Sequence, residues 1–164
     1  MNKLQHYNPY MRIYSAGKIW HSPDFRDLRD NMGYNITANW IDMGAQADGD
    51  ERIWPHCLRD AANCDLLILY CGDENEEQRG AIVEAGHAMA AGKPVYAIGK
   101  CKTLMANEIS DVAFTKDASW HWTRATTLKA GYREACFHFI KNYSVPQIGD
   151  LHYSLEPTQQ EIAA

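Results

Sequence analysis

The 164-residue sequence contains no apolar run that approaches the length of a membrane span. Its first ten residues are polar and irregular and lack the hydrophobic segment of a secretory signal. The five cysteines form no CxxC pair, and their odd number argues against a complete disulfide framework. We therefore expect a protein without a membrane anchor, in a reducing compartment, and so in the cytoplasm.

An excess of positive charge is also lacking, since 21 Asp and Glu outnumber 16 Lys and Arg and the formal net charge is -5. Binding a nucleic-acid backbone requires clustered Lys and Arg, so polymeric nucleic acid is not an expected partner. No GxGxxG or Walker phosphate-binding sequence occurs, and the seven histidines lack the spacing of metal ligands. The sequence therefore predicts neither a cofactor nor a metal, whereas a nucleotide, which needs one or two local donors, stays possible.

The composition is that of a globular domain, with 46% hydrophobic and 23% charged residues. Residues 1–143 are long enough for one domain with one core. Residues 144–164 contain prolines and a glycine and show little periodicity, so we expect a C-terminal tail there.

A strand–helix–strand unit is the clearest pattern in the chain. Residues 65–70 form a short apolar run bounded by polar residues, as expected of a buried parallel strand. Small and apolar residues over 80–91 predict a helix packed closely on a sheet, ended by Gly92-Lys93-Pro94. A new strand then begins near residue 94, so the unit is of the parallel α/β type.

The remaining elements are assigned by periodicity and by turn residues. Ser22 is the predicted N-cap of a helix, with Pro23 in its first turn. Ser119–Trp122 is interpreted as a loop or the start of a helix. The predicted strands are 11–15, 35–41, 65–71, 94–98 and 111–114, and the other helices cover about 49–63 and 126–143.

Glu84 does not fit a packing role in the predicted helix, because its neighbours are small and apolar. One interpretation is an exposed carboxylate that favours the helix N-terminus. The other is a functional carboxylate at the carboxyl end of a parallel sheet, where open α/β folds bind their ligands. Gly80 and Gly86 flank it and would let a ligand approach the backbone.

The segment GAIVEAGHA at residues 80–88, followed by GKPV at 92–95, resembles the nucleoside 2-deoxyribosyltransferase superfamily. That superfamily includes the 2'-deoxynucleoside 5'-phosphate N-hydrolases. Tyr14-Ser15-Ala16-Gly17 is similar to the end of the family's first strand. The likeness covers about residues 11–100 and implies a flavodoxin-like (Rossmann-like) three-layer α/β domain with a mostly parallel five-stranded sheet.

The resemblance implies an enzyme that cleaves or transfers at the N-glycosidic bond of a (deoxy)nucleoside or its 5'-monophosphate. Glu84 matches the family's nucleophile, and Tyr14 matches the tyrosine that positions it. Tyr14 is equally consistent with a core aromatic, and both roles are compatible if its hydroxyl reaches the site. Whether water or a second base takes the sugar stays open.

The second acid of this chemistry is harder to assign. The position at which the family usually has an Asp falls on Cys57. Asp60, on the same predicted helix, is a candidate acid or sugar-hydroxyl partner. The alternative is an exposed helix charge, or one paired with Arg59 or Arg52. Nucleoside transferases often have a base-reading Asp six residues before the nucleophile, where this chain has Gln78.

The resemblance also suggests a set of substrate-binding residues at the same sheet edge. Lys18 and Arg79 would supply positive charge, although both suit a solvated surface as well. Three tryptophans, at positions 20, 40 and 54, would stack on a base or belong to the core or an interface. The expected substrate-binding residues are Ser15, Gly17, Lys18, Gln78, Arg79 and Gly80.

Two other functions remain open at this point. The missing acid at Cys57 favours a non-catalytic nucleotide-binding or sensing domain on the same fold. An enzyme of different scope, such as an NAD-glycohydrolase, is a further alternative. Family members are commonly homo-oligomers, so the resemblance implies a dimer or a higher assembly.

Overall fold

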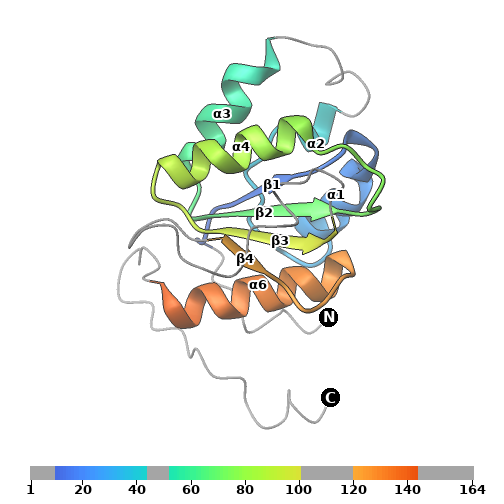
Figure 1. The fold of residues 1–164 in the computed structure, drawn as a ribbon, viewed down its shortest axis with the longest axis vertical. Coiled ribbons are helices and arrows are strands. Elements are labelled where there is room, and N and C mark those ends of the chain that lie inside the picture. Colours follow the sequence, from blue (N-terminus) through green and yellow to red (C-terminus); the bar gives the residue numbers. More distant parts are fainter. Residues whose placement is uncertain (1–9, 44–51, 101–119, 144–164) are drawn as a thin grey trace, which may run out of the picture.

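The computed structural model describes residues 10–43, 52–100 and 120–143. Within these ranges the chain forms an α/β domain around four parallel strands, in the spatial order β1-β2-β3-β4 (Figure 1). This architecture is consistent with a Rossmann-like fold. The strands are β1 (Ile13–Ala16), β2 (Leu66–Cys71), β3 (Val95–Gly99) and β4 (Trp120–Trp122).

Helices cover both faces of this sheet (Figure 1). α4 packs on β1, β2 and β3, with α3 against it, and α6 packs on β2 and β3 from the other side. No helix in the described ranges is long and apolar enough to cross a membrane. The helices are η1 (Ile19–His21), α1 (Ser22–Asp30), α2 (Trp40–Met43), α3 (Ile53–Asn63), α4 (Arg79–Ala90) and α6 (Leu128–Asn142).

The predicted strand–helix–strand unit is confirmed as β2, α4 and β3. Five of the six residues of β2 are buried, with Tyr70 the exception, because helices cover the strand on both faces. Gly92 follows the end of α4 with a φ of +77°, a left-handed conformation that glycine adopts without steric cost. At the start of α1, Ser22 is the first helical residue and His21 the N-cap, one residue earlier than predicted.

The predicted second strand, 35–41, is wrong. Only Ile36 pairs with β1, through an isolated parallel bridge to Ile13. From Trp40 the chain turns into α2, which the bidentate ion pair of Arg29 with Asp42 ties to α1 at 2.7 and 2.8 Å. The β-favouring residues of this segment therefore fill the core without forming a ladder.

The predicted five-stranded sheet is corrected to four strands in the described part of the chain. The expected strand at 111–114 and the tail at 144–164 lie outside the described residues. Trp120–Trp122, interpreted from sequence as a loop or helix start, forms β4, with Trp120 opposite Val95 and Trp122 opposite Ala97. Trp120 is fully buried, as suits an aromatic residue on a pleated surface.

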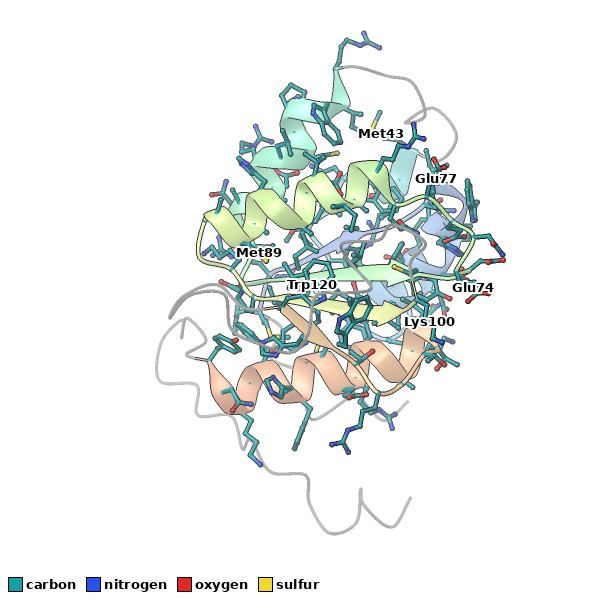
Figure 2. All side chains as sticks on the ribbon, in the orientation of Figure 1. Met43, Glu74, Glu77, Met89, Lys100 and Trp120 are labelled. Carbon is teal, nitrogen blue, oxygen red and sulfur yellow. The ribbon has the colours of Figure 1, made fainter. Side chains whose placement is uncertain are left out.

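The strand order creates a crevice between β1 and β2. Counting the bridge at Ile36, the order along the sheet is 2-1-3-4-5, with the switch point between the first and third segments. α1 follows β1 onto the face of α6, where Lys129 pairs with Asp27 at 2.9 Å, whereas α4 follows β2 onto the other face. Glu74 and Glu77 lie at the strands' carboxyl ends and Met89 at the opposite end (Figure 2).

Candidate functional site

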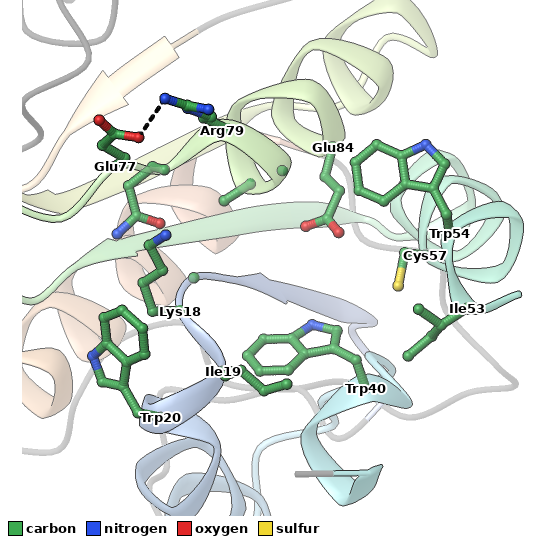
Figure 3. Close-up of a pocket in the computed structure, with 14 residues that line it drawn as sticks. Lys18, Ile19, Trp20, Trp40, Ile53, Trp54, Cys57, Glu77, Arg79 and Glu84 are labelled. Atoms are coloured by element: carbon green, nitrogen blue, oxygen red, sulfur yellow. Dashed lines mark ion pairs between the residues drawn. The ribbon is translucent and has the colours of Figure 1, made fainter. Parts of the chain in front are cut away.

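A cavity of about 320 Å³ lies at this switch point (Figure 3). One wall is the loop after β1, another is the start of α4, and α2 and α3 close the third side. The lining residues are 17–20, Trp40, Ile53, Trp54, Cys57, 77–81 and Glu84.

Glu84 stands in the second turn of α4, and its carboxylate points into the cavity (Figure 3). The residue is only 7% exposed, so the interpretation of Glu84 as a solvated helix charge is wrong. Burial disfavours the charged form and raises the pKa of Glu84 to about 7. The carboxyl group therefore changes its protonation state near neutral pH, as groups at functional sites often do.

Tyr14 lies on β1 beside Glu84 and is completely buried. Its hydroxyl has no hydrogen-bond partner of normal geometry among the described residues, yet it is close enough to lower the pKa of Glu84. Burial raises the pKa of Tyr14 far above its usual range, so the hydroxyl stays protonated and can only donate to a carboxylate. Tyr14 is thus a core aromatic whose hydroxyl belongs to the site.

Cys57 lines the cavity from α3. It occupies the position at which the resemblance would place an acid. Burial is the main cause that raises the pKa of this thiol, so Cys57 is neutral at physiological pH. The cavity therefore contains a weak hydrogen-bonding group where a second carboxylate was expected.

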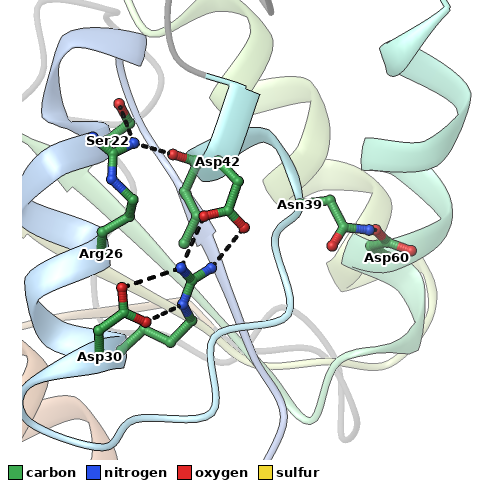
Figure 4. Close-up of polar contacts among 8 residues, drawn as sticks. Ser22, Arg26, Asp30, Asn39, Asp42 and Asp60 are labelled. Carbon is green, nitrogen blue, oxygen red and sulfur yellow. Dashed lines mark hydrogen bonds and ion pairs between the residues drawn. The ribbon is translucent and has the colours of Figure 1, made fainter.

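The structure does not bring Asp60 to the cavity. Its carboxylate accepts hydrogen bonds from Arg59 at 3.3 Å and from Asn39 at 3.4 Å (Figure 4). Three residues along a helix correspond to a rise of about 4.5 Å and a rotation of about 300°. Asp60 is therefore displaced along α3 from Cys57 and is held in surface contacts, which matches the alternative interpretation.

Ser15, expected to bind substrate, lies on the wrong face of the sheet for this role. Its hydroxyl is hydrogen-bonded to that of Tyr132 on α6. Successive side chains of a strand point to opposite faces, so Tyr14 and Ser15 cannot both face the cavity. The assignment of Ser15 is corrected to a structural contact between the sheet and α6.

The other five expected substrate-binding residues line the cavity: Gly17, Lys18, Gln78, Arg79 and Gly80. A Cβ atom at Gly17 would lie 3.2 Å from the carbonyl oxygen of Tyr70, tighter than most contacts. A Cβ atom at Gly80 would lie 3.5 Å from the Trp54 ring. Gly80 therefore leaves room beside Trp54 in the cavity, whereas Gly17 allows close packing of the loop after β1 against β2.

The charged residues of the cavity divide into a rim and an interior. Arg79 is 84% exposed and pairs with Glu77 at 2.7 Å, turned away from Glu84 (Figure 3). The Lys18 ammonium lies 5.4 Å from the centre of the Trp20 ring. The sequence gives no sign that Glu77 lines the cavity, because nothing distinguishes it from the other acidic residues at 72–79.

Trp20, Trp40 and Trp54 all reach the cavity. Trp40 is buried, and its indole N–H donates to the backbone carbonyl of Ser15 at 2.9 Å, which fixes the ring. Trp54 is 36% exposed and Trp20 59% exposed, so their rings stand at the opening. A flat ligand in the cavity would therefore lie near aromatic rings both in the interior and at the opening.

Within the described ranges, no group of three or more His, Cys, Asp or Glu side chains is arranged to hold a metal ion. No protein-family model matches the chain, and no curated protein matches its sequence.

Proposed function

We propose that this protein is an enzyme that cleaves or transfers at the N-glycosidic bond of a (deoxy)nucleoside or its 5'-monophosphate. The observation that carries the proposal is the buried Glu84 carboxylate, aimed into a cavity at the sheet's switch point. Beside it lies the Tyr14 hydroxyl, which has no hydrogen-bond partner of normal geometry among the described residues. A cavity of about 320 Å³ with aromatic walls suits a small flat ligand.

In the proposed reaction, ionised Glu84 attacks the anomeric carbon as the bond to the base breaks. The base leaves with the bonding electron pair and takes a proton from water. Water or a second base then attacks the sugar ester, which releases the carboxylate of Glu84. Tyr14 would donate a hydrogen bond to the carboxylate and so orient it.

The test is incubation of the pure protein with deoxynucleosides and their 5'-monophosphates, with and without a free acceptor base. Chromatography of the products separates the two activities. Free base without an acceptor would identify a hydrolase, and exchange only with an acceptor would identify a transferase. Absence of product from every substrate would contradict the proposal.

One observation favours a second candidate, a nucleotide-binding or sensing domain without catalysis. Among the described residues, Glu84 is the one carboxylate in the cavity's interior, since Glu77 lies at the rim and Cys57 occupies the expected acid position. Comparison of the wild type with Glu84→Gln separates the candidates. Loss of turnover with retained binding supports the enzyme, whereas binding without turnover in both proteins supports the sensor.

We also propose that the protein forms a homo-oligomer. Trp54 and Val83 are 36% and 51% exposed on α3 and α4, the helices that border the cavity. Apolar side chains in such a position suit burial against a second copy. Light scattering should give a mass of at least twice 18.6 kDa, and a monomeric mass at working concentration would contradict this.

A further inference from the structure

Glu76 connects the two loops that border the cavity, although it does not line the cavity of Glu84 itself. Its side chain is 9% exposed. Oε1 accepts the indole N–H of Trp20 at 2.8 Å and lies 2.9 Å from Nε2 of His21, in the loop after β1. Oε2 accepts the backbone N–H of Gly72 at 3.2 Å and the amide of Gln78 at 3.0 Å, in the loop after β2.

These contacts determine which way the Gln78 amide faces. An indole N–H and a backbone N–H can only donate, so both oxygens of Glu76 act as acceptors. The group that Gln78 turns toward Glu76 must then be its NH₂, and its Oε1 must face elsewhere. Gln78 lines the cavity, is 1% exposed, and its Oε1 has no partner among the described residues.

A buried acceptor without a partner is costly, and a ligand that supplies a donor removes this cost. A ligand with a carbonyl at the same point would place two acceptors against each other. A Gln78 amide held in one orientation thus favours a ligand that presents a donor over one that presents an acceptor. An amide that is free to turn would accept both.

We propose that Glu76 is a positioning residue that locks the Gln78 amide, so that the cavity selects nucleobases that carry an exocyclic amino group. The inference rests on the proposed function for the class of ligand. It adds which kind of base edge the cavity accepts and which residue outside the cavity sets that choice.

The test measures binding by calorimetry in the Glu84→Gln background, so that no ligand is consumed. The ligands form two pairs that differ by amino against carbonyl: deoxyadenosine with deoxyinosine, and deoxycytidine with deoxyuridine. In at least one pair the amino-bearing member should bind roughly tenfold more tightly. Equal affinities in both pairs, or tighter binding of the carbonyl members, would overturn the inference.

Glu76→Gln tests the lock itself. A glutamine at position 76 can present either its oxygen or its NH₂, so the Gln78 amide can turn and the preference should fall to about twofold or less. Trp20→Phe is the matched control, because it removes a donor to Oε1 and leaves the contact from Oε2 to Gln78. Trp20→Phe should keep the preference for amino-bearing bases even if it weakens the binding of all four nucleosides.

Gln78→Met provides a second route if Glu76→Gln loosens the loops. Methionine has a similar size to glutamine but lacks the Oε1 acceptor, so the preference for amino-bearing bases should disappear while Glu76 stays in place. Full preference in Glu76→Gln would overturn the role of Glu76, and full preference in Gln78→Met would overturn that of Gln78.

Failure of the inference and failure of the proposed function give different results. Turnover by the wild type without a base preference in binding overturns the inference alone. A base preference in binding without turnover overturns the proposed catalysis and supports the inference. Absence of binding in both pairs, tested as nucleosides and as their 5'-monophosphates, overturns both.

Discussion

Tyr14 and Ser15 are neighbours on β1, and their hydroxyls face opposite sides of the sheet. The Ser15 hydroxyl is hydrogen-bonded to Tyr132, under α6. The Tyr14 hydroxyl is buried beside Glu84, under α3 and α4, without a partner of normal geometry in the described part of the chain. One face thus has its buried polar group satisfied, and the other does not.

This difference indicates which face is suited to bind a ligand. Leaving a buried polar group unsatisfied costs roughly 1–3 kcal/mol, so folded proteins seldom do it without a functional reason. The buried Glu84 carboxyl adds to that cost on the same face, through its raised pKa. Under α6 the buried Ser15 hydroxyl is hydrogen-bonded, which favours stability. Under α4 the buried Tyr14 and Glu84 lower stability at the place where a substrate would bind.

The largest expected effect comes from Glu84→Gln. Loss of the proposed nucleophile should reduce turnover roughly a thousandfold or more, measured as base release by chromatography. Asp60→Asn is the matched control, because it makes the same chemical change outside the cavity, and it should keep turnover within about twofold. A comparable loss in Asp60→Asn would restore Asp60 as the second acid.

The same Glu84→Gln change should stabilise the protein at alkaline pH. The rise in the pKa of Glu84 from its ordinary 4.5 to about 7 corresponds to about 3 kcal/mol. A raised carboxyl pKa means that stability is fully present below pH 4.5 and is lost as pH rises through 7. Thermal unfolding at about pH 8 should show the variant more stable, with the difference vanishing near pH 4. Equal stabilities at pH 8 would show that Glu84 is not desolvated.

The pH dependence of the wild type should report the same carboxyl group. A nucleophilic carboxylate must be ionised, so kcat/KM should fall as pH drops below about 7. Between about pH 8 and pH 5 the expected decrease is roughly a hundredfold. A profile that stays flat down to pH 5 would mean that Glu84 titrates near its ordinary pKa.

The smallest effects come from the pair Tyr14→Phe and Ser15→Ala, which should separate the two faces. Tyr14→Phe should reduce kcat about tenfold and raise the pKa of Glu84 further. It should cost little stability, since the Tyr14 hydroxyl has no hydrogen-bond partner of normal geometry among the described residues. Ser15→Ala should leave Tyr132 without its Ser15 contact and destabilise the fold by about 1–3 kcal/mol, with turnover kept. Denaturant unfolding and steady-state kinetics on both variants check this, and the reverse pattern would exchange the roles of the faces.

Local patterns were sufficient for the part of the fold around α4. The apolar run of β2 and the small-residue helix were predictable, because a strand buried on both faces and a helix packed on it need these residue types at short range. The segment 35–41 shows the limit of such patterns. Its residues favour a strand, but their packing on β1 and the anchoring of α2 by Arg29 determine its conformation.

The site shows the same division. Glu84, Gln78 and Gly80 could be found from sequence, because they stand in one segment whose spacing matches a known pattern. Ser15 and Asp60 were assigned to the wrong place, because each lies near a cavity-lining residue in the chain but on a different side in space. Glu76 and Glu77 carry no sequence signal, since five of the eight residues at 72–79 are charged.

The sequence by itself determined the parallel α/β class in outline, the position of α4 and the candidate nucleophile, because these depend on neighbours along the chain. Only the tertiary structure decided that Tyr14 and not Ser15 faces the cavity, that Cys57 lines it while Asp60 does not, and that Glu76 orients Gln78. The pKa of Glu84 belongs to the second group as well. It arises from burial by segments far apart in the chain, and burial is not a property of a residue or of its sequence neighbours.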